Sequence, residues 1–158
     1  HLLSRRQRQM CIRDRNTIIV IDTKGGDATD ILTINAMMCG ERVICPVNPC
    51  EFTTEGLNFL SSDVDYIREK YNRKLRLAGV FKTMWKQANH NATKNVEKEL
   101  EPYSKLMYDT VVPSGIHVQT SIQEKLPLSL SSVKSSPVAK AYNELSKEIL
   151  IKWERIVR

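Results

Sequence analysis

Short apolar runs alternate with longer segments of helical period along most of this chain. Ile18 to Ile21 is a continuous β-branched run without polar alternation, which is typical of a strand covered on both faces of a parallel sheet. Similar runs predict further strands at 42–47, 75–83 and 106–112. Helical period predicts helices at 29–38, from Thr53 or Thr54 to Tyr71, at 92–101 and at 136–157. This order predicts an α/β fold with a mostly parallel sheet flanked by helices.

The last helix carries the clearest local signals. Ser136 is placed to cap it, and Pro137 suits its first position. The serine-rich stretch before it, 114–136, is predicted to be a loop with one helical turn near 121–125. No internal repeat or change of composition follows residue 16, so we expect one domain over 16–158.

Length and composition fit a single soluble domain. The chain has 158 residues, of which 41% are hydrophobic and 27% charged. These fractions are ordinary for a globular protein, and no run approaches the roughly 18 apolar residues that a membrane span needs. A cytoplasmic protein is therefore expected.

The basic charge is concentrated in a short head. Of the net charge of +6, residues 1–15 contribute +4, from five arginines and one aspartate. This head has no apolar period, no helix cap and no signal-peptide pattern, and position 1 is not methionine. It resembles a translated sequencing adapter joined to a truncated reading frame. We expect a non-native or disordered head outside the fold; a natural basic arm that binds nucleic acid is the alternative.

The cysteines do not predict a metal site or a disulfide framework. Cys11, Cys39, Cys45 and Cys50 form no CxxC pair, and two prolines lie between the last two. We expect reduced, mostly buried thiols.

The glycine turn after the first predicted strand resembles a phosphate-binding loop without its chemistry. A Walker A loop, G-x-x-x-x-G-K-[ST], wraps phosphates with backbone N–H groups and places a lysine on them. Here Lys24-Gly25-Gly26 is followed by Asp27 and Asp30, whose charge would repel a phosphate. A phosphate cradle at these residues is not expected.

Asp22 suggests a different nucleotide function. An acidic side chain at the carboxyl end of a buried strand is the Walker B arrangement, in which the carboxylate orients the water shell of the Mg²⁺ carried by ATP or GTP. Open α/β sheets bind ligands at that edge. On the pattern alone, Asp22 as a cap of the turn into the next helix is an equal alternative.

Five segments in unbroken order resemble the ParA family of deviant Walker P-loop ATPases, relatives of MinD. The first is "IIVIDTKGGDATDILTINAM", similar to the family's "IIIDTPP" followed by "LLTINAL". The others are "RVICPVNPCEFTTEGLNFL", "LAGVFKTM", "YDTVVP" and "AKAYNELSKEIL", and the match covers about 16–152.

The resemblance implies a doubly wound, P-loop NTPase-like fold and an ATP-dependent dimerisation switch. Its role would be plasmid or chromosome partitioning, or the positioning of another cargo. It implies ATP and Mg²⁺ as cofactors, a homodimer, non-specific DNA binding and a ParB-like or other activating partner. Asp22 matches the Walker B carboxylate, with a catalytic and metal-side role. Thr83, Met84 and Pro113 fall on segments that border the adenine.

Several positions depart from the family pattern. The amino-terminal strand and the Walker A loop, KGGxGK[ST], have no counterpart here, so we expect a partial domain that does not hydrolyse ATP alone. Lys24-Gly25-Gly26 replaces a Pro-Pro pair, which leaves the motion of that switch open. Ser114 and His117 replace arginines, which weakens one contribution to DNA contact.

Two surfaces suggest binding partners. The basic series formed by Lys82, Lys86, His90, Lys94 and Lys98 predicts a DNA contact, although Glu97, Glu99 and Glu101 make a solvated helix face an equal account.

The end of the last helix, "ILIKWERIVR", has the pattern of an amphipathic membrane anchor of the MinD type. Packing of that stripe on the sheet is simpler, so a membrane is not the expected partner. The alternatives to a partitioning switch are therefore a MinD-like membrane-associated ATPase and a non-catalytic interaction module. In such a module, a parallel sheet without its first strands would expose a hydrophobic edge.

Overall fold

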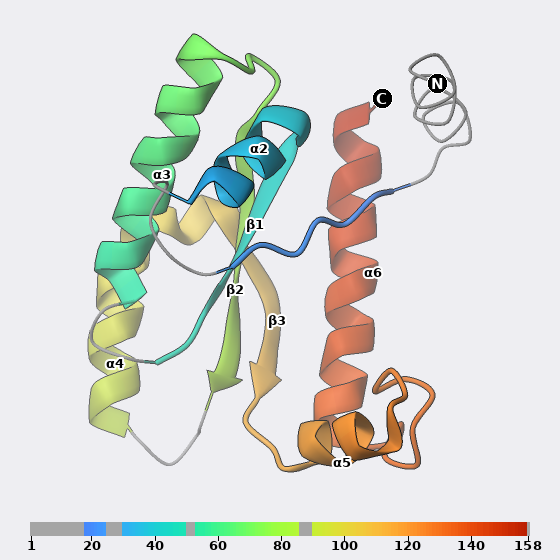
Figure 1. Cartoon of the computed structure of the whole chain (residues 1–158). Coiled ribbons are helices and arrows are strands. Elements are labelled where there is room, and N and C mark those ends of the chain that lie inside the picture. Colours follow the sequence, from blue (N-terminus) through green and yellow to red (C-terminus); the bar gives the residue numbers. More distant parts are fainter. Residues whose placement is uncertain (1–17, 25–29, 50–52, 86–89, 158) are drawn as a thin grey trace, which may run out of the picture.

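The computed structural model describes residues 18–24, 30–49, 53–85 and 90–157. Three parallel strands, in the order β1-β2-β3, form its centre (Figure 1). They are β1 (Arg42–Val47), β2 (Arg76–Trp85) and β3 (Met107–Pro113). The α/β fold class with a parallel sheet is therefore confirmed.

Helices cover both faces of this sheet. Figure 1 shows α3 and α4 on one side and α6 on the other. The helical elements are α2 (Ile31–Cys39), α3 (Thr53–Lys70), α4 (His90–Glu99), the short 3-10 helix η1 (Glu101–Leu106), α5 (His117–Glu124) and α6 (Pro137–Val157).

The core consists of separate apolar clusters on the two faces. Under α3 and α4, Val80 of β2 is fully buried with Leu57 and Val96. A second cluster joins α2, α3 and the residue before β2 through Met37, Val64, Ile67 and Leu75. On the opposite face, α6 packs on β3 through Tyr108, Val112, Val138 and Leu145. Burial on both faces explains why the strands read as continuous apolar runs.

Helix caps fix where α2 and α6 begin. The Asp30 carboxylate accepts a hydrogen bond from the N–H of Leu32 at 2.9 Å. The Ser136 hydroxyl accepts one from the N–H of Ala139 at 3.2 Å, with Pro137 at the first helical position. Ser136 therefore caps the last helix, as its sequence predicts.

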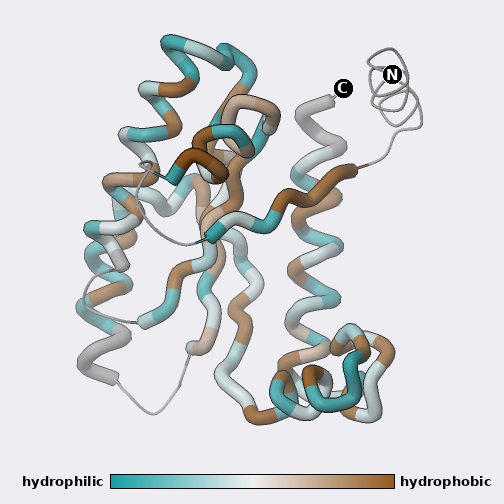
Figure 2. Tube along the Cα trace, viewed as in Figure 1, coloured by the Kyte–Doolittle hydropathy of each residue, from teal (hydrophilic) through white to brown (hydrophobic). Residues whose placement is uncertain are grey.

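The strand predicted at Ile18–Ile21 is wrong. Residues 18–24 are irregular, and Val20 is 87% exposed. Figure 2 shows this hydrophobic segment running outside the helices and strands. A strand needs a neighbour for its N–H and C=O groups, and none of β1, β2 or β3 pairs with residues 18–24. The apolar run is therefore not enough to form a strand here.

Smaller differences lie at loops and element ends. Nothing in the sequence pattern predicts η1. The turn expected near 121–125 is the longer helix α5, whose C-cap residue, Lys125, has a left-handed backbone (φ 53°). Cys39 is exposed and Cys45 half-buried, so the expectation of mostly buried thiols is wrong for Cys39; both are free. Cys11, Cys50 and the basic head lie outside the described residues.

Candidate functional site

The carboxyl ends of β2 and β3 meet at one edge of the sheet. Trp85 pairs with Pro113, and the N–H of Ser114 donates to the carbonyl of Trp85 at 3.2 Å. This pairing brings Thr83 and Met84 of β2 to the same edge as Pro113 of β3. Thr83 and Pro113 are half-buried and Met84 is exposed.

A bulge at this edge turns Met84 outward. From Lys82 to Trp85 the register advances three residues on β2, while β3 advances only two, from Val111 to Pro113. Met84 has a left-handed backbone (φ 53°), and 62% of it is exposed. Such a φ is uncommon outside glycine, and bulges re-aim side chains beside binding sites. The edge therefore presents a flexible apolar side chain to solvent.

Asp22 does not join this edge as a strand-end carboxylate. It is exposed and lies in the irregular segment 18–24. Among the described residues, no group of three or more His, Cys, Asp or Glu side chains is placed to hold a metal. Gly25, Gly26 and Asp27 lie outside the described residues, so the expectation of no phosphate cradle there stays a prediction.

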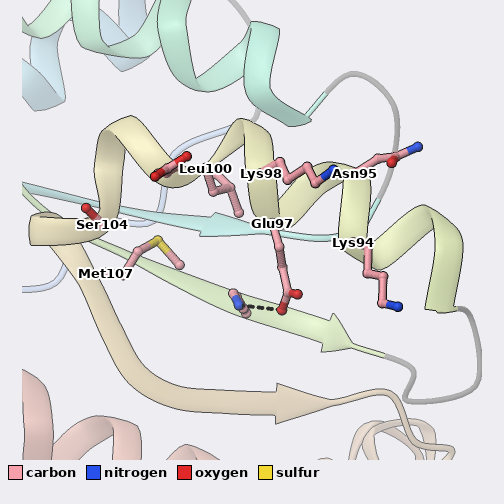
Figure 3. A pocket seen from close by; sticks show the side chains of 9 residues that line it. Lys94, Asn95, Glu97, Lys98, Leu100, Ser104 and Met107 are labelled. Atoms are coloured by element: carbon pink, nitrogen blue, oxygen red, sulfur yellow. Dashed lines mark hydrogen bonds and ion pairs between the residues drawn. The ribbon is translucent and has the colours of Figure 1, made fainter.

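Three of the lysines predicted to contact DNA line one cavity. Lys82, Lys94 and Lys98 surround a space of about 890 Å³ between α4, η1 and the strands (Figure 3). We call it the α4 groove; its other lining residues are Asn95, Glu97, Leu100, Glu101, Ser104 and Met107. Lys86 and the side chain of His90 lie outside the described residues. The sheet thus assembles part of a basic series that is spread over the sequence.

An ion pair crosses the α4 groove. Lys82 Nζ on β2 lies 2.9 Å from Glu97 Oε1 on α4, and 5.0 Å from the centre of the Trp85 ring. The Lys82 side chain is 21% exposed and that of Glu97 46%. The aromatic face and the carboxylate both favour a cation, so Lys82 is held in one position.

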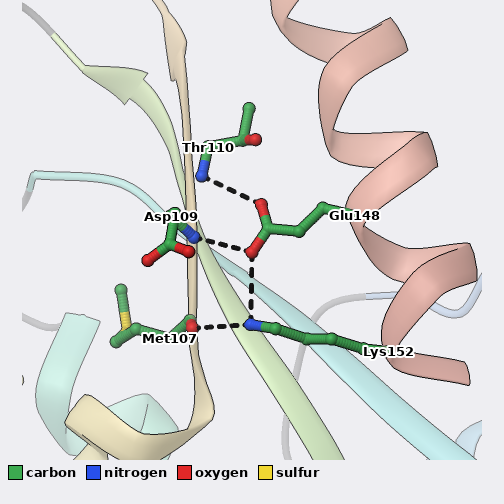
Figure 4. A network of polar contacts seen from close by, with 5 residues as sticks. All are labelled: Met107, Asp109, Thr110, Glu148 and Lys152. Carbon is green, nitrogen blue, oxygen red and sulfur yellow. Dashed lines mark hydrogen bonds and ion pairs between the residues drawn. The ribbon is translucent and has the colours of Figure 1, made fainter. Parts of the chain in front are cut away.

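Helix α6 is fastened to β3 by a polar network that the sequence does not reveal (Figure 4). The Glu148 carboxylate accepts from the N–H groups of Asp109 at 2.8 Å and Thr110 at 3.0 Å. Lys152 Nζ donates to the carbonyl of Met107 at 3.0 Å and lies 3.2 Å from Glu148. The four-residue spacing of Glu148 and Lys152 was the only available signal, and it does not identify β3 as the partner.

The apolar stripe of α6 faces the sheet. Ile149 packs against the cluster of Tyr108 and Val112, and the Arg42 guanidinium lies 4.7 Å from the centre of the Trp153 ring. Packing therefore accounts for these positions of the suspected anchor. Within the described ranges, no helix is long and apolar enough to cross a membrane.

The chain is similar to proteins named for chromosome partitioning over most of its length. It is 29% identical over 136 residues to the chromosome partitioning protein ParA of Caulobacter vibrioides, which covers 85% of this chain and 49% of that protein. It is 24% identical over 139 residues to the chromosome-partitioning ATPase Soj of Treponema pallidum, covering 88% and 54%. These similarities support a ParA-like relationship.

The match is partial on the side of the relatives. An uncharacterized protein of Mycobacterium tuberculosis is 28% identical over 140 residues, which is 88% of this chain and 43% of that protein. The chain thus spans about half the length of these relatives. No protein-family model matches it.

Proposed function

We propose that this chain is part of a ParA-like ATPase that acts as an ATP-dependent dimerisation switch. Its task would be plasmid or chromosome partitioning, or the positioning of another cellular cargo. The observation that carries the proposal is the similarity to ParA and Soj proteins over 85% and 88% of the chain. The parallel sheet with helices on both faces supports it, since nucleotides bind at the carboxyl edge of such sheets.

In this proposal the adenine of ATP lies beside the carboxyl ends of β2 and β3. Thr83, Met84 and Pro113 fit such a role because they lie together at one edge. The exposed Met84 and the Pro113 ring offer apolar surface to a planar base, and the Thr83 hydroxyl is both a donor and an acceptor.

The residues described here do not assemble a site for the Mg²⁺ that accompanies ATP. Asp22 is exposed outside the sheet, and no acidic cluster accompanies it among the described side chains. The role proposed for Asp22, a carboxylate near that ion, rests on its match to the Walker B segment.

Non-specific DNA and an activating partner belong to the same proposal. Lys82, Lys94 and Lys98 line one groove, and lysines that neutralise phosphates bind duplex DNA without reading its sequence. A ParB-like or other protein would stimulate hydrolysis. The described surface offers no feature that identifies it.

ATP turnover and mass in solution test the switch. We expect the complete gene product to hydrolyse ATP and to double its mass with ATP, and the 158-residue chain alone to show no turnover above the blank. Asp22→Asn should lower turnover of the complete protein at least about tenfold. The control is Asp65→Asn, which removes an exposed acid on α3 paired with Arg68.

Two results would overturn the proposal. One is a complete protein that does not hydrolyse ATP and whose mass in solution does not change when ATP is added. The other is turnover by the 158-residue chain that Asp22→Ala abolishes, since that would place the whole catalytic site within these residues.

A further inference from the structure

The α4 groove contains a preorganised lysine side chain. Lys82 is mostly covered, and its ammonium lies between the Trp85 ring and the Glu97 carboxylate. A side chain that is already ordered loses little conformational freedom when a ligand replaces one of its contacts. Of the three lysines that line the groove, Lys82 is therefore the one whose side chain is preorganised to bind an anion.

A second cation lies along the same groove. Figure 3 shows Lys94 and Glu97 descending from α4 toward the strands, and a dashed line marks the ion pair that Glu97 forms. In the described part of the chain, no ion pair is recorded for Lys94 or Lys98, although both line the groove. An anion placed beside Lys82 would thus have two further lysines along the groove, which Glu101 also lines. Among the described residues, the ion pair of Glu97 is with Lys82.

We propose that the α4 groove binds a phosphate group, and that Glu97 is an internal competitor for Lys82. The Glu97 side chain is 46% exposed, and ion pairs of that kind are weak enough to exchange. A phosphate offers the same ammonium more negative charge and three acceptor oxygens. Asn95 and Ser104 supply neutral donors to the groove, and Leu100 and Met107 supply an apolar wall.

The phosphate group can belong to a free phosphorylated small molecule or to the backbone of a nucleic acid, and both present the same chemistry to Lys82. The lining residues of the groove differ from Thr83, Met84 and Pro113, which are proposed to border the adenine. The nucleic-acid source rests on the DNA contact of the proposed function, whereas the competition between Glu97 and a phosphate for Lys82 goes beyond it, and its test uses this chain without ATP.

Titration calorimetry at low salt tests the competition, with inorganic tripolyphosphate as one probe and a random duplex as the other. Glu97→Gln keeps the size and helix preference of the side chain but frees Lys82. We expect it to tighten binding of at least one probe about two- to fivefold. In Lys82→Gln that gain should disappear, so that the double variant binds like Lys82→Gln alone.

The matched control is Glu144→Gln, which makes the same charge change on α6 and removes a comparable ion pair, 2.7 Å to Lys147. A gain for both probes indicates a general phosphate site. A gain for tripolyphosphate alone indicates a small molecule, and a gain for duplex alone indicates a nucleic acid. The proposal is overturned if Glu97→Gln gains no more than Glu144→Gln, or if no variant binds either probe.

Discussion

The Glu148 carboxylate on α6 accepts a hydrogen bond from the backbone N–H of Asp109 on β3 at 2.8 Å. The register explains why that N–H needs a partner. Between Val80 and Lys82 of β2, β3 advances four residues, from Met107 to Val111. The extra residues of β3 bulge out of the ladder, and Glu148 supplies the acceptors that β2 does not.

Removing Glu148 should destabilise the fold. Glu148→Ala leaves the N–H groups of Asp109 and Thr110 without their charged acceptor. We therefore expect the free energy of unfolding, measured in urea, to fall by about 2 kcal/mol. Glu144→Gln, at an exposed position of the same helix, should change the free energy of unfolding by less than about 0.5 kcal/mol. Equal effects at the two positions would contradict a specific role of the Glu148 carboxylate in holding α6 on β3.

The same contacts make stability depend on pH. Burial raises the pKa of Glu148, but the N–H donors of Asp109 and Thr110 and the Lys152 ammonium outweigh it, and the net pKa lies below its ordinary value of 4.5. Glu148 therefore stabilises the fold fully above that ordinary value, and this contribution is lost as pH falls through the lowered pKa. The difference in unfolding free energy between the wild type and Glu148→Gln should shrink as pH falls below 4.5. A pH-independent difference would contradict this account.

Gly79 should not tolerate a side chain. A Cβ built there lies 2.1 Å from the ring of Tyr108, which is itself buried. Gly79→Ala should therefore cost about 2 kcal/mol, and Tyr108→Leu in the same chain should return part of it. At Gly56 of α3 a Cβ meets nothing within 4 Å, so Gly56→Ala should stabilise by about 1 kcal/mol. Thermal unfolding of these three variants and the wild type checks both signs.

Local signals account for what the sequence predicts well. Ser136 and Pro137 mark the start of α6 because a cap involves only neighbouring residues. The contact of Glu148 with β3 could not be predicted, because Glu148 and Asp109 are far apart in the chain. The bulge that leaves the N–H of Asp109 in need of an acceptor exists only once β2 and β3 pair. The run at Ile18–Ile21 fails for the related reason that a strand depends on its neighbour, and periodicity cannot supply one. Asp22 loses its strand-end position with that run.

Because Met84 has a left-handed backbone, glycine at this position should be more stable than valine, which reverses their usual order of stability in a strand. At φ 53° a β-branched side chain is strained, so Met84→Gly should be more stable than Met84→Val by at least about 1 kcal/mol. At Val111, a partly exposed position of β3, glycine should be the less stable residue. Urea unfolding of the wild type, Met84→Gly, Met84→Val and Val111→Gly measures the order of stability of glycine and valine at both positions. The same order at positions 84 and 111 would contradict strain at Met84.

The two described cysteines should differ in reactivity. Burial raises the pKa of Cys45 to about 11, whereas Cys39 is exposed. Because the thiolate is the reactive form, Cys39 should react with a thiol reagent at pH 7.5 at least about tenfold faster. The experiment uses Cys11→Ser/Cys50→Ser, with Cys39→Ser and Cys45→Ser added singly to assign each rate. Comparable rates would show that Cys45 is accessible in solution.

The lysines of the α4 groove should set the salt dependence of DNA binding. Each lysine that neutralises a phosphate contributes about 0.9 to the slope of log affinity against log salt. Lys94→Gln/Lys98→Gln should therefore lower that slope by about 2 on random duplex, equally for different sequences. Lys140→Gln/Lys147→Gln makes the same charge change on α6, on the opposite face of the sheet, and should leave the slope unchanged. If both double variants lower the slope alike, only the overall charge attracts DNA, and the groove is not its contact.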